Sequence, residues 1–192
     1  MMAAQKDNDV RRELRKDEPM SRHTSWRVGG PADLFFVPAS VEDLSLFLNE
    51  LDSKTPIFWH GVGSNLLVRD GGIRGVVISA ARILRNLEKV DQYKVKAGSG
   101  VPCTQLARQC VRWKLGPAEF FAVIPGPIGG ALAMNAAPHG GETGEHLQSV
   151  PTRDGRGAIH ERMPTRYQVA AIDRAHVQSP MSPQPRLLRR LH

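Results

Sequence analysis

Two glycine-rich turns constrain this chain more than any other feature of its sequence. The first, Gly61-Val62-Gly63-Ser64-Asn65, follows the apolar run Ile57-Phe58-Trp59, and the second is Pro125-Gly126-Pro127-Ile128-Gly129-Gly130. Glycine permits positive φ and lets main-chain N–H groups approach a bulky anion that a side chain would block. Two such turns in one chain suggest a cofactor held by its phosphates, although their spacing alone favours plain structural turns.

The surroundings of the glycines exclude two common phosphate motifs. The spacing Gly61-x-Gly63 begins like a dinucleotide fingerprint, but Leu66 stands where the third glycine is expected. The residues after it reach a turn at Asp70-Gly71-Gly72 rather than opening a long helix. Neither cluster continues into the Gly-Lys-Ser/Thr of a P-loop. What remains is a loop between two strands whose N–H groups can face phosphate.

The apolar pattern around the first turn predicts an α/β fold. Residues 32–37 and 56–59 fit short buried strands. Ser40-x-x-Asp43 is a capping box for a helix whose apolar residues recur at helical spacing to Leu51. This β-α-β order predicts a lobe with a parallel pair of strands. Trp26 and Trp59 are expected in the core.

A second lobe is expected to begin near Gly75. Residues 76–78 and 93–97 fit strands, and a helix is predicted from about Thr104 to a stop at Leu115-Gly116-Pro117. The apolar face of this helix is predicted to contain Leu106, Ala107, Cys110 and Val111. Cys103 and Cys110 share one face and are interpreted as buried free thiols, and no metal site is expected.

Composition and charge limit where in the cell the protein is expected and which classes of partner it is expected to bind. No apolar run reaches the roughly 18 residues of a membrane span, and residues 1–18 lack the apolar core of a secretory signal. We therefore expect a cytoplasmic protein with no membrane partner. Of the net charge of +7, residues 153–192 carry +5 with a single aromatic residue, Tyr167. Nucleic acid is disfavoured as a partner because its binding surface needs a basic stripe with interleaved aromatic residues.

Three segments together resemble one flavoenzyme family. They are His23-Thr24-Ser25-Trp26-Arg27-Val28-Gly29-Gly30-Pro31-Ala32-Asp33, then Gly61 to Val68, then Ile124 to Ala131 and on to Asn135. In this order they are similar to the UDP-N-acetylenolpyruvoylglucosamine reductases, over residues from about Asp17 to about Val169. The resemblance implies a two-lobed α/β (α+β) FAD-binding module of the vanillyl-alcohol-oxidase type, with the substrate domain missing.

The resemblance also implies which residues hold FAD. The residues matched to the pyrophosphate loop are Gly61, Gly63, Ser64 and Asn65. The residues matched to the segment along the flavin and phosphates are Ile124, Pro125, Gly126, Gly129, Gly130 and Asn135. After Asn135-Ala136 the family has a glycine where this chain has Ala137-Pro138, which is expected to strain the turn and lower the affinity for FAD. His60 is interpreted as structural, with contact to the flavin as the alternative.

The reaction of that family is reduction of UDP-N-acetylglucosamine enolpyruvate to UDP-N-acetylmuramate for peptidoglycan, with NADPH as the reductant and FAD as the carrier. Its Tyr-Arg pair should follow Tyr167-Gln168-Val169, but Ala170-Ala171-Ile172 stands there. The family's proton-donating serine and its C-terminal glutamate have no counterpart either, so no catalytic residue is assigned. A frameshift or truncation after about Val169 is the hypothesis for this loss of pattern.

The expected organisation is a polar leader (1–20), a first FAD-binding lobe (21–74), a second FAD-binding lobe (75–169) and a disordered or off-family tail (170–192). Three functions remain open at this point. They are the NADPH-dependent reductase, an FAD-binding remnant without catalytic activity, and an interaction protein that acts through its basic tail.

Overall fold

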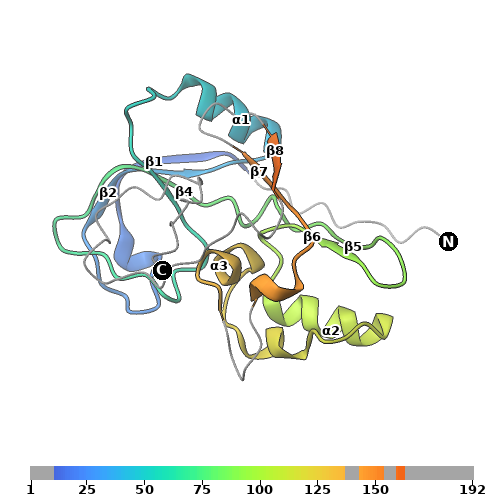
Figure 1. Cartoon of the computed structure of the whole chain (residues 1–192). Coiled ribbons are helices and arrows are strands. Elements are labelled where there is room, and N and C mark those ends of the chain that lie inside the picture. Colours follow the sequence, from blue (N-terminus) through green and yellow to red (C-terminus); the bar gives the residue numbers. More distant parts are fainter. Residues whose placement is uncertain (1–10, 137–142, 154–158, 163–192) are drawn as a thin grey trace, which may run out of the picture.

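The computed structural model describes residues 11–136, 143–153 and 159–162, and its helices and strands are drawn in Figure 1. The strands are β1 (Glu13–Pro19), β2 (Pro31–Val37), β3 (Ile57–Trp59), β4 (Ile73–Ile78), β5 (Leu87–Lys89), β6 (Val95–Ala97), β7 (Val150–Arg153) and β8 (Ile159–Arg162). The helices are α1 (Val41–Glu50), α2 (Cys103–Trp113) and α3 (Ile128–Ala133), with 3-10 turns η1 (Met20–Arg22), η2 (Glu119–Val123) and η4 (Thr143–His146). The predicted tail and the Ala137-Pro138 pair lie outside the described residues.

Four strands form the main sheet, in the order β1-β2-β4-β3. Strand β4 lies between β2 and β3 and is parallel to both, whereas β1 is antiparallel to β2. The expected β-α-β unit is present as β2-α1-β3, but its two strands are separated by β4. The lobe boundary expected at residues 74 and 75 must move beyond Ile78, because it would divide β4. Buried Val76, Val77 and Ile78 make β4 the centre of the sheet.

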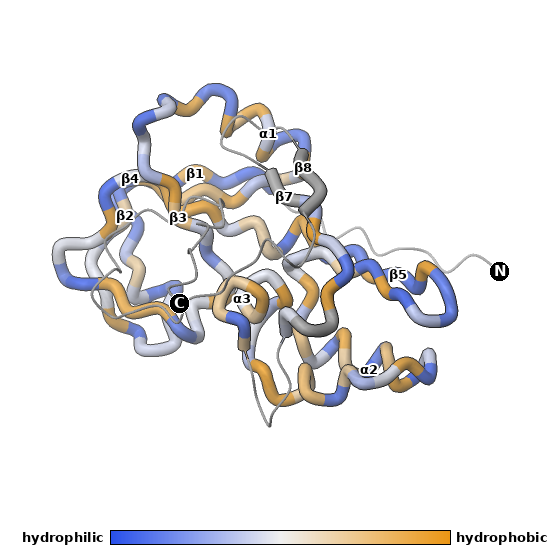
Figure 2. Tube along the Cα trace, in the orientation of Figure 1, coloured by the Kyte–Doolittle hydropathy of each residue, from blue (hydrophilic) through white to orange (hydrophobic). Residues whose placement is uncertain are grey.

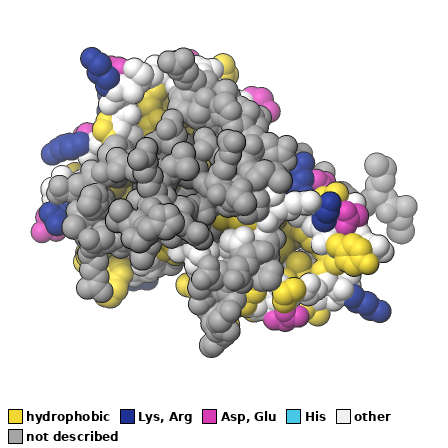
Figure 3. Space-filling model, viewed as in Figure 1, with side chains coloured by type: hydrophobic (Ala, Val, Ile, Leu, Met, Phe, Trp, Pro, Cys, Tyr) yellow, Lys and Arg dark blue, Asp and Glu magenta, His cyan; other side chains and the backbone are white. Residues whose placement is uncertain are grey.

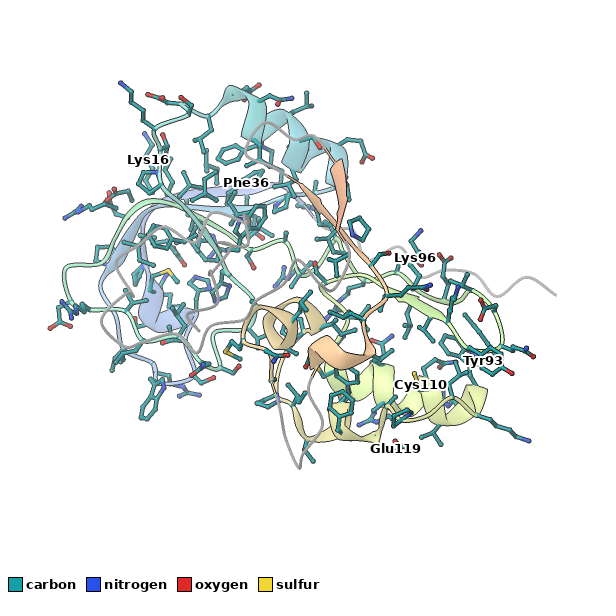
Figure 4. All side chains as sticks on the ribbon, in the orientation of Figure 1. Lys16, Phe36, Tyr93, Lys96, Cys110 and Glu119 are labelled. Carbon is teal, nitrogen blue, oxygen red and sulfur yellow. The ribbon has the colours of Figure 1, made fainter. Side chains whose placement is uncertain are left out.

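The N-terminal strand β1 corrects the expectation of a polar leader over residues 1–20. It pairs with β2 along its whole length, from Glu13 opposite Val37 to Pro19 opposite Pro31. Most of its side chains are exposed, and Lys16 points away from the sheet (Figure 4). Charged side chains on an edge strand discourage further pairing. Apolar periodicity misses this strand because it is stabilised by pairing with β2 and has no buried apolar face.

Helix α1 covers one face of the main sheet (Figure 1). As predicted, the Ser40 hydroxyl caps it by accepting the N–H of Asp43 at 3.1 Å, and the Asp43 carboxylate accepts the N–H of Ala39 at 2.9 Å. Phe36 of β2 stacks on Phe47 of the helix, with ring centroids 3.9 Å apart. Figure 4 shows Phe36 between sheet and helix. The buried residues of this layer are Phe36, Leu44, Phe47, Leu48, Val76, Ile78 and Ala80.

Chain segments without α-helix cover the opposite face of the main sheet. The buried cluster there consists of Met20, Ala32, Phe35, Val37, Val68 and Val77. Two backbone hydrogen bonds join the covering segments, from the N–H of Gly30 to the carbonyl of Arg69 and from the N–H of Ser25 to the carbonyl of Gly63, both at 3.0 Å. The segment after β1 and the first glycine turn therefore lie side by side on this face.

Helix α2 packs its apolar face against η2 and the segment before the second glycine turn. Orange, hydrophobic stretches of the trace meet there in Figure 2. The predicted face is confirmed for Leu106, Ala107 and Cys110, which are buried. Val111 is 63% exposed, so its predicted place in the core is wrong. The helix ends at Trp113, and the residue after it, Lys114, caps it in the left-handed conformation at φ 56, so the helix stops before the predicted glycine.

Both cysteines are buried free thiols, as predicted. Burial raises the pKa of the Cys103 thiol to about 11 and also raises the pKa of Cys110, to which the nearby Glu119 carboxylate adds. Thiols with raised pKa values are poor nucleophiles at neutral pH. Their role here is to fill the core under α2.

The hairpin β5–β6 extends from the molecule beside α2. The strand predicted over residues 93–97 is shorter, since Tyr93 lies in the turn and is 81% exposed. Val90 and Val111 are also exposed, and Figure 3 shows hydrophobic side chains at the end of the molecule where Figure 4 labels Tyr93.

Within the described ranges, every helix is too short or too polar to cross a bilayer.

Candidate cofactor site

The two glycine turns, far apart in sequence, meet in the structure. The Ser64 hydroxyl donates a hydrogen bond to the carbonyl of Pro125 at 3.4 Å. A Cβ placed on Gly61 would lie 3.3 Å from Cγ of Pro127, and one placed on Gly126 would lie 3.6 Å from the Ser64 oxygen. The turns thus form one continuous surface, which the sequence predicts only as two separate motifs.

The first turn lies where parallel sheets usually bind ligands. It follows the carboxyl end of β3, and the N–H of His60 donates to the carbonyl of Ile78 at the carboxyl end of β4, at 2.8 Å. Ligands of open α/β sheets bind outside the carboxyl ends of the strands. The fold therefore places the Gly61–Asn65 turn at the expected edge.

The backbone of the first turn fits a phosphate. Gly63 is buried at φ +67, and any Cβ there would overlap the carbonyl oxygen of His23. In the described part of the chain, the N–H groups from Gly61 to Asn65 donate to no protein acceptor. A run of N–H groups without acceptors, next to a glycine with positive φ, is a ready anion cradle. The residues present fit the pyrophosphate of a dinucleotide.

The second turn supports the site rather than cradling an anion. The N–H groups of Ile128 and Gly129 are already bound to the carbonyls of Val101 and Ser99, at 2.9 and 2.8 Å. Gly126 has φ +115, and its carbonyl accepts the N–H of Cys103 at 2.9 Å. A Cβ on Gly129 would come within 2.8 Å of the Ser99 Cβ, so this glycine allows close packing. The second turn is therefore held by hydrogen bonds and close packing to the segment from Ser99 to Cys103.

The remaining predicted site residues lie in different surroundings: some contact other segments near the turns and one is buried in the core. The side-chain amide of Asn65 lies 2.8 Å from the Met134 sulfur, just past α3. Ile124 is buried in the core beneath α2. Asn135 has φ 43, and its side-chain oxygen accepts the N–H of Gly144 at 2.9 Å, which fixes the chain after α3. Ile124 therefore packs in the core before the second turn, and Asn135 holds the chain that follows α3.

A partly buried polar network lies next to the first turn, and most of its residues are not among the predicted site residues. Nε2 of His60 lies 2.8 Å from the carbonyl oxygen of His23, and Nε2 of His23 lies 2.8 Å from Oε1 of Glu18. Arg15 donates to the same Glu18 oxygen at 2.9 Å. Arg15 and Glu18 lie in β1, whereas His23 and His60 lie in loops. Apolar periodicity gives no signal for these polar contacts. The only signal is that His23 begins the first of the three segments that carry the resemblance.

The network shifts three pKa values. Hydrogen bonds to Glu13 and Glu18 raise the pKa of Arg15. Burial raises the pKa of Glu18, but the hydrogen bonds from His23 and Arg15 outweigh it, so the net pKa is lowered. Burial lowers the pKa of His60, and the nearby His23 lowers it further, against the hydrogen bond to the His23 carbonyl. At neutral pH His60 is therefore neutral and Glu18 ionised.

Exposed apolar side chains border the first turn. Trp26 is 69% exposed, so its predicted place in the core is wrong, and Val62 within the turn is 54% exposed. Trp26 follows Ser25, whose N–H binds the Gly63 carbonyl. Trp59, in contrast, is half-buried against the α1 layer. An exposed indole beside an anion cradle is available to a ring system.

Comparisons with known proteins agree with this geometry. The family described as FAD binding domain matches residues 32–162. The UDP-N-acetylenolpyruvoylglucosamine reductase of Alkalilimnicola ehrlichii is 50% identical over 157 residues, which are 82% of this chain and 52% of that protein. This chain spans about half the length of the curated relatives it matches.

Solved structures show the same fold. The UDP-N-acetylenolpyruvylglucosamine reductase from Thermus caldophilus superposes with a TM-score of 0.64 at 30% identity, covering 82% of this chain and 54% of that one. The 4-ethylphenol oxidase from Gulosibacter chungangensis superposes with a TM-score of 0.52 at 13% identity, covering 68% of this chain and 27% of that one. The predicted fold class, a two-lobed module of the vanillyl-alcohol-oxidase type, is confirmed.

Proposed function

Because this chain belongs to the FAD-binding domain family, we propose that it is the FAD-binding part of a UDP-N-acetylenolpyruvoylglucosamine reductase. The proposed reaction uses NADPH to reduce UDP-N-acetylglucosamine enolpyruvate to UDP-N-acetylmuramate in the cytoplasm, for cell-wall synthesis. The observation that carries the proposal is the meeting of the two glycine turns, joined by the Ser64–Pro125 hydrogen bond.

The first turn is proposed to hold the pyrophosphate of FAD. Its N–H groups from Gly61 to Asn65 supply donors, and the side-chain amide of Asn65 adds a donor at the same surface, while the Ser64 hydroxyl joins the first turn to Pro125. Backbone donors suit this task because they neutralise phosphate charge without a lysine. Pro125, Gly126, Gly129 and Gly130 are proposed to line the cofactor from the opposite side, with Ile124 and Asn135 supporting them.

Bound FAD supplies the hydride transfer that protein side chains cannot perform. The protein residues described here bind and orient; none is assigned a proton transfer or the stabilisation of charge on the substrate. We propose that the part of the relatives that this chain does not span performs these tasks.

A second candidate function is FAD binding without turnover. It rests on the coverage, since this chain matches only about half of the length of the relatives. Both functions share the cofactor site and differ in the chemistry that follows.

One preparation tests both functions. The purified full chain is examined for a flavin absorbance spectrum and then for NADPH oxidation that depends on the enolpyruvyl substrate. A flavin spectrum with substrate-dependent oxidation supports the reductase, and a flavin spectrum without it supports the binding module. A chain that takes up no FAD, even on titration with excess cofactor, contradicts both.

Ser64→Ala localises the binding, with Ser53→Ala as its matched control. Ser64 contacts the second turn, whereas Ser53 is an exposed residue in the turn before β3. We expect Ser64→Ala to weaken FAD binding by about tenfold, because it removes the hydrogen bond that holds the two turns together. Ser53→Ala should bind as the unmodified chain does, and equal affinity in the two variants would place the cofactor elsewhere.

A further inference from the structure

The side chain of His60 is bonded to a segment far away in the sequence. Because its Nε2 faces a carbonyl oxygen, that nitrogen carries the proton and donates to His23 at 2.8 Å. Nδ1 is then the acceptor and faces the Ser79 hydroxyl at 3.5 Å. The ring also makes edge contacts with Phe35 and His23, with centroid distances of 5.8 and 5.9 Å. The imidazole is therefore held in one tautomer and one orientation.

The bond from His60 closes a ring of contacts around the first glycine turn. From His23 the chain runs to Ser25, whose N–H donates to the carbonyl of Gly63 at 3.0 Å. From Gly63 the chain runs back through Gly61 to His60 itself. The His23 carbonyl that accepts the imidazole N–H is also the atom that leaves Gly63 no room for a Cβ. One side chain therefore holds the backbone against which the middle of the turn rests.

His60 holds the His23 carbonyl, because the side chain of His23 is engaged elsewhere. The imidazole of His23 is used by Glu18, which Arg15 also binds, so His23 offers only its carbonyl to the turn. His60 is uncharged at neutral pH because burial lowers its pKa.

We propose that His60 is a positioning residue for FAD, which sets the shape of the Gly61–Asn65 turn by holding the His23 carbonyl. This inference rests on the proposed function, because it assigns the turn to the cofactor pyrophosphate. The notion that His60 touches the flavin is replaced by an indirect role, since its donor nitrogen is already engaged.

Three substitutions separate the hydrogen bond from the packing of the ring. His60→Gln keeps an N–H donor at a similar reach, and His60→Phe keeps a ring of similar size without a donor. His60→Met removes the donor with a flexible side chain, in case the phenyl ring does not fit. The affinity for FAD is measured by quenching of flavin fluorescence. The amide exchange rate of Ser25 is measured by NMR without FAD.

We expect His60→Phe and His60→Met to weaken FAD binding by about tenfold and to speed Ser25 exchange by a similar factor, as for one lost hydrogen bond. His60→Gln should stay within about threefold of the unmodified chain in both measurements. Ser79→Ala, which removes the longer contact, should have little effect. The inference is overturned if His60→Phe keeps full affinity and slow exchange, or if His60→Gln loses as much as His60→Phe. If the unmodified chain binds no FAD, the proposed function fails, and Ser25 exchange still decides whether His60 holds the turn.

Discussion

At the scale of single residues, Gly63 is the position where the cradle is least tolerant of change. Its φ of +67 and its contact with the His23 carbonyl both exclude a side chain. Gly63→Ala should cost about 1–3 kcal/mol of stability through backbone strain and weaken FAD binding by at least about tenfold. Thermal unfolding and FAD titration measure the two effects.

Gly71→Ala is the control for that substitution, because a Cβ on Gly71 would meet nothing within 4 Å. Its stability and its FAD affinity should match those of the unmodified chain. Similar losses in both variants would mean that the position of Gly63 is not special.

Glu18 links the network under the turn to pH. It is only 6% exposed, and its lowered pKa means that the folded state favours the ionised carboxylate. The stability it contributes is present above the ordinary pKa of 4.5 and is lost as the pH falls below that value. Glu18→Gln should therefore cost about 1.5–3 kcal/mol at pH 7 and progressively less in acid.

Urea unfolding at a series of pH values measures this loss. Glu88→Gln is the matched control, since Glu88 forms an exposed pair with Lys96 at 3.6 Å, and such pairs contribute little. A constant difference between Glu18→Gln and the unmodified chain from pH 7 to pH 3 would contradict the role of the charge.

The residue scale also shows what the sequence can reveal of a site. Gly61, Gly63 and Ser64 are predictable because the backbone conformation of the cradle requires particular residue types at short spacing. Glu18 and His60 are not, because polar contacts give no periodic signal, and the contact between His60 and His23 forms only when distant segments of the chain meet. The prediction that Trp26 lies in the core is wrong for a related reason. The exposure of a side chain depends on which segments pack around it in the folded chain.

At the scale of elements, the N-terminal cap of α1 follows from local sequence. The Ser40 hydroxyl accepts the N–H of Asp43, and Ser40→Ala should cost about 1 kcal/mol of unfolding free energy. Denaturant titration measures the loss, with Ser53→Ala as the neutral comparison. Equal stability of the two variants would show that α1 depends on packing alone.

Helix α2 shows the limit of periodicity. Leu106 and Val111 both fit the predicted apolar face, but Leu106 is 8% exposed and Val111 63%. Leu106→Ala should cost about 2–5 kcal/mol by leaving a cavity, whereas Val111→Ala should change stability by less than about 0.5 kcal/mol. A large loss from Val111→Ala would indicate that another surface covers this residue in solution.

At the scale of the whole molecule, a ligand that contacts both turns joins the main sheet to the second lobe. FAD at one hundred times its dissociation constant should stabilise the folded chain by about 2.7 kcal/mol, which raises the melting temperature by several degrees. Calorimetry with and without FAD measures the shift. Ser64→Ala should show a smaller shift at the same FAD concentration, and equal shifts would mean that the contact between the turns is not part of the site.

The order of the main sheet sets when it can form during synthesis. Strands β2 and β3 do not pair with each other, and β4, which is made after both, pairs with each of them. Until Ile78 has left the ribosome, β1 and β2 are a bare hairpin and β3 has no neighbour. The nascent chain therefore has unpaired strand edges over this interval, and the main sheet can be completed only once β4 is available.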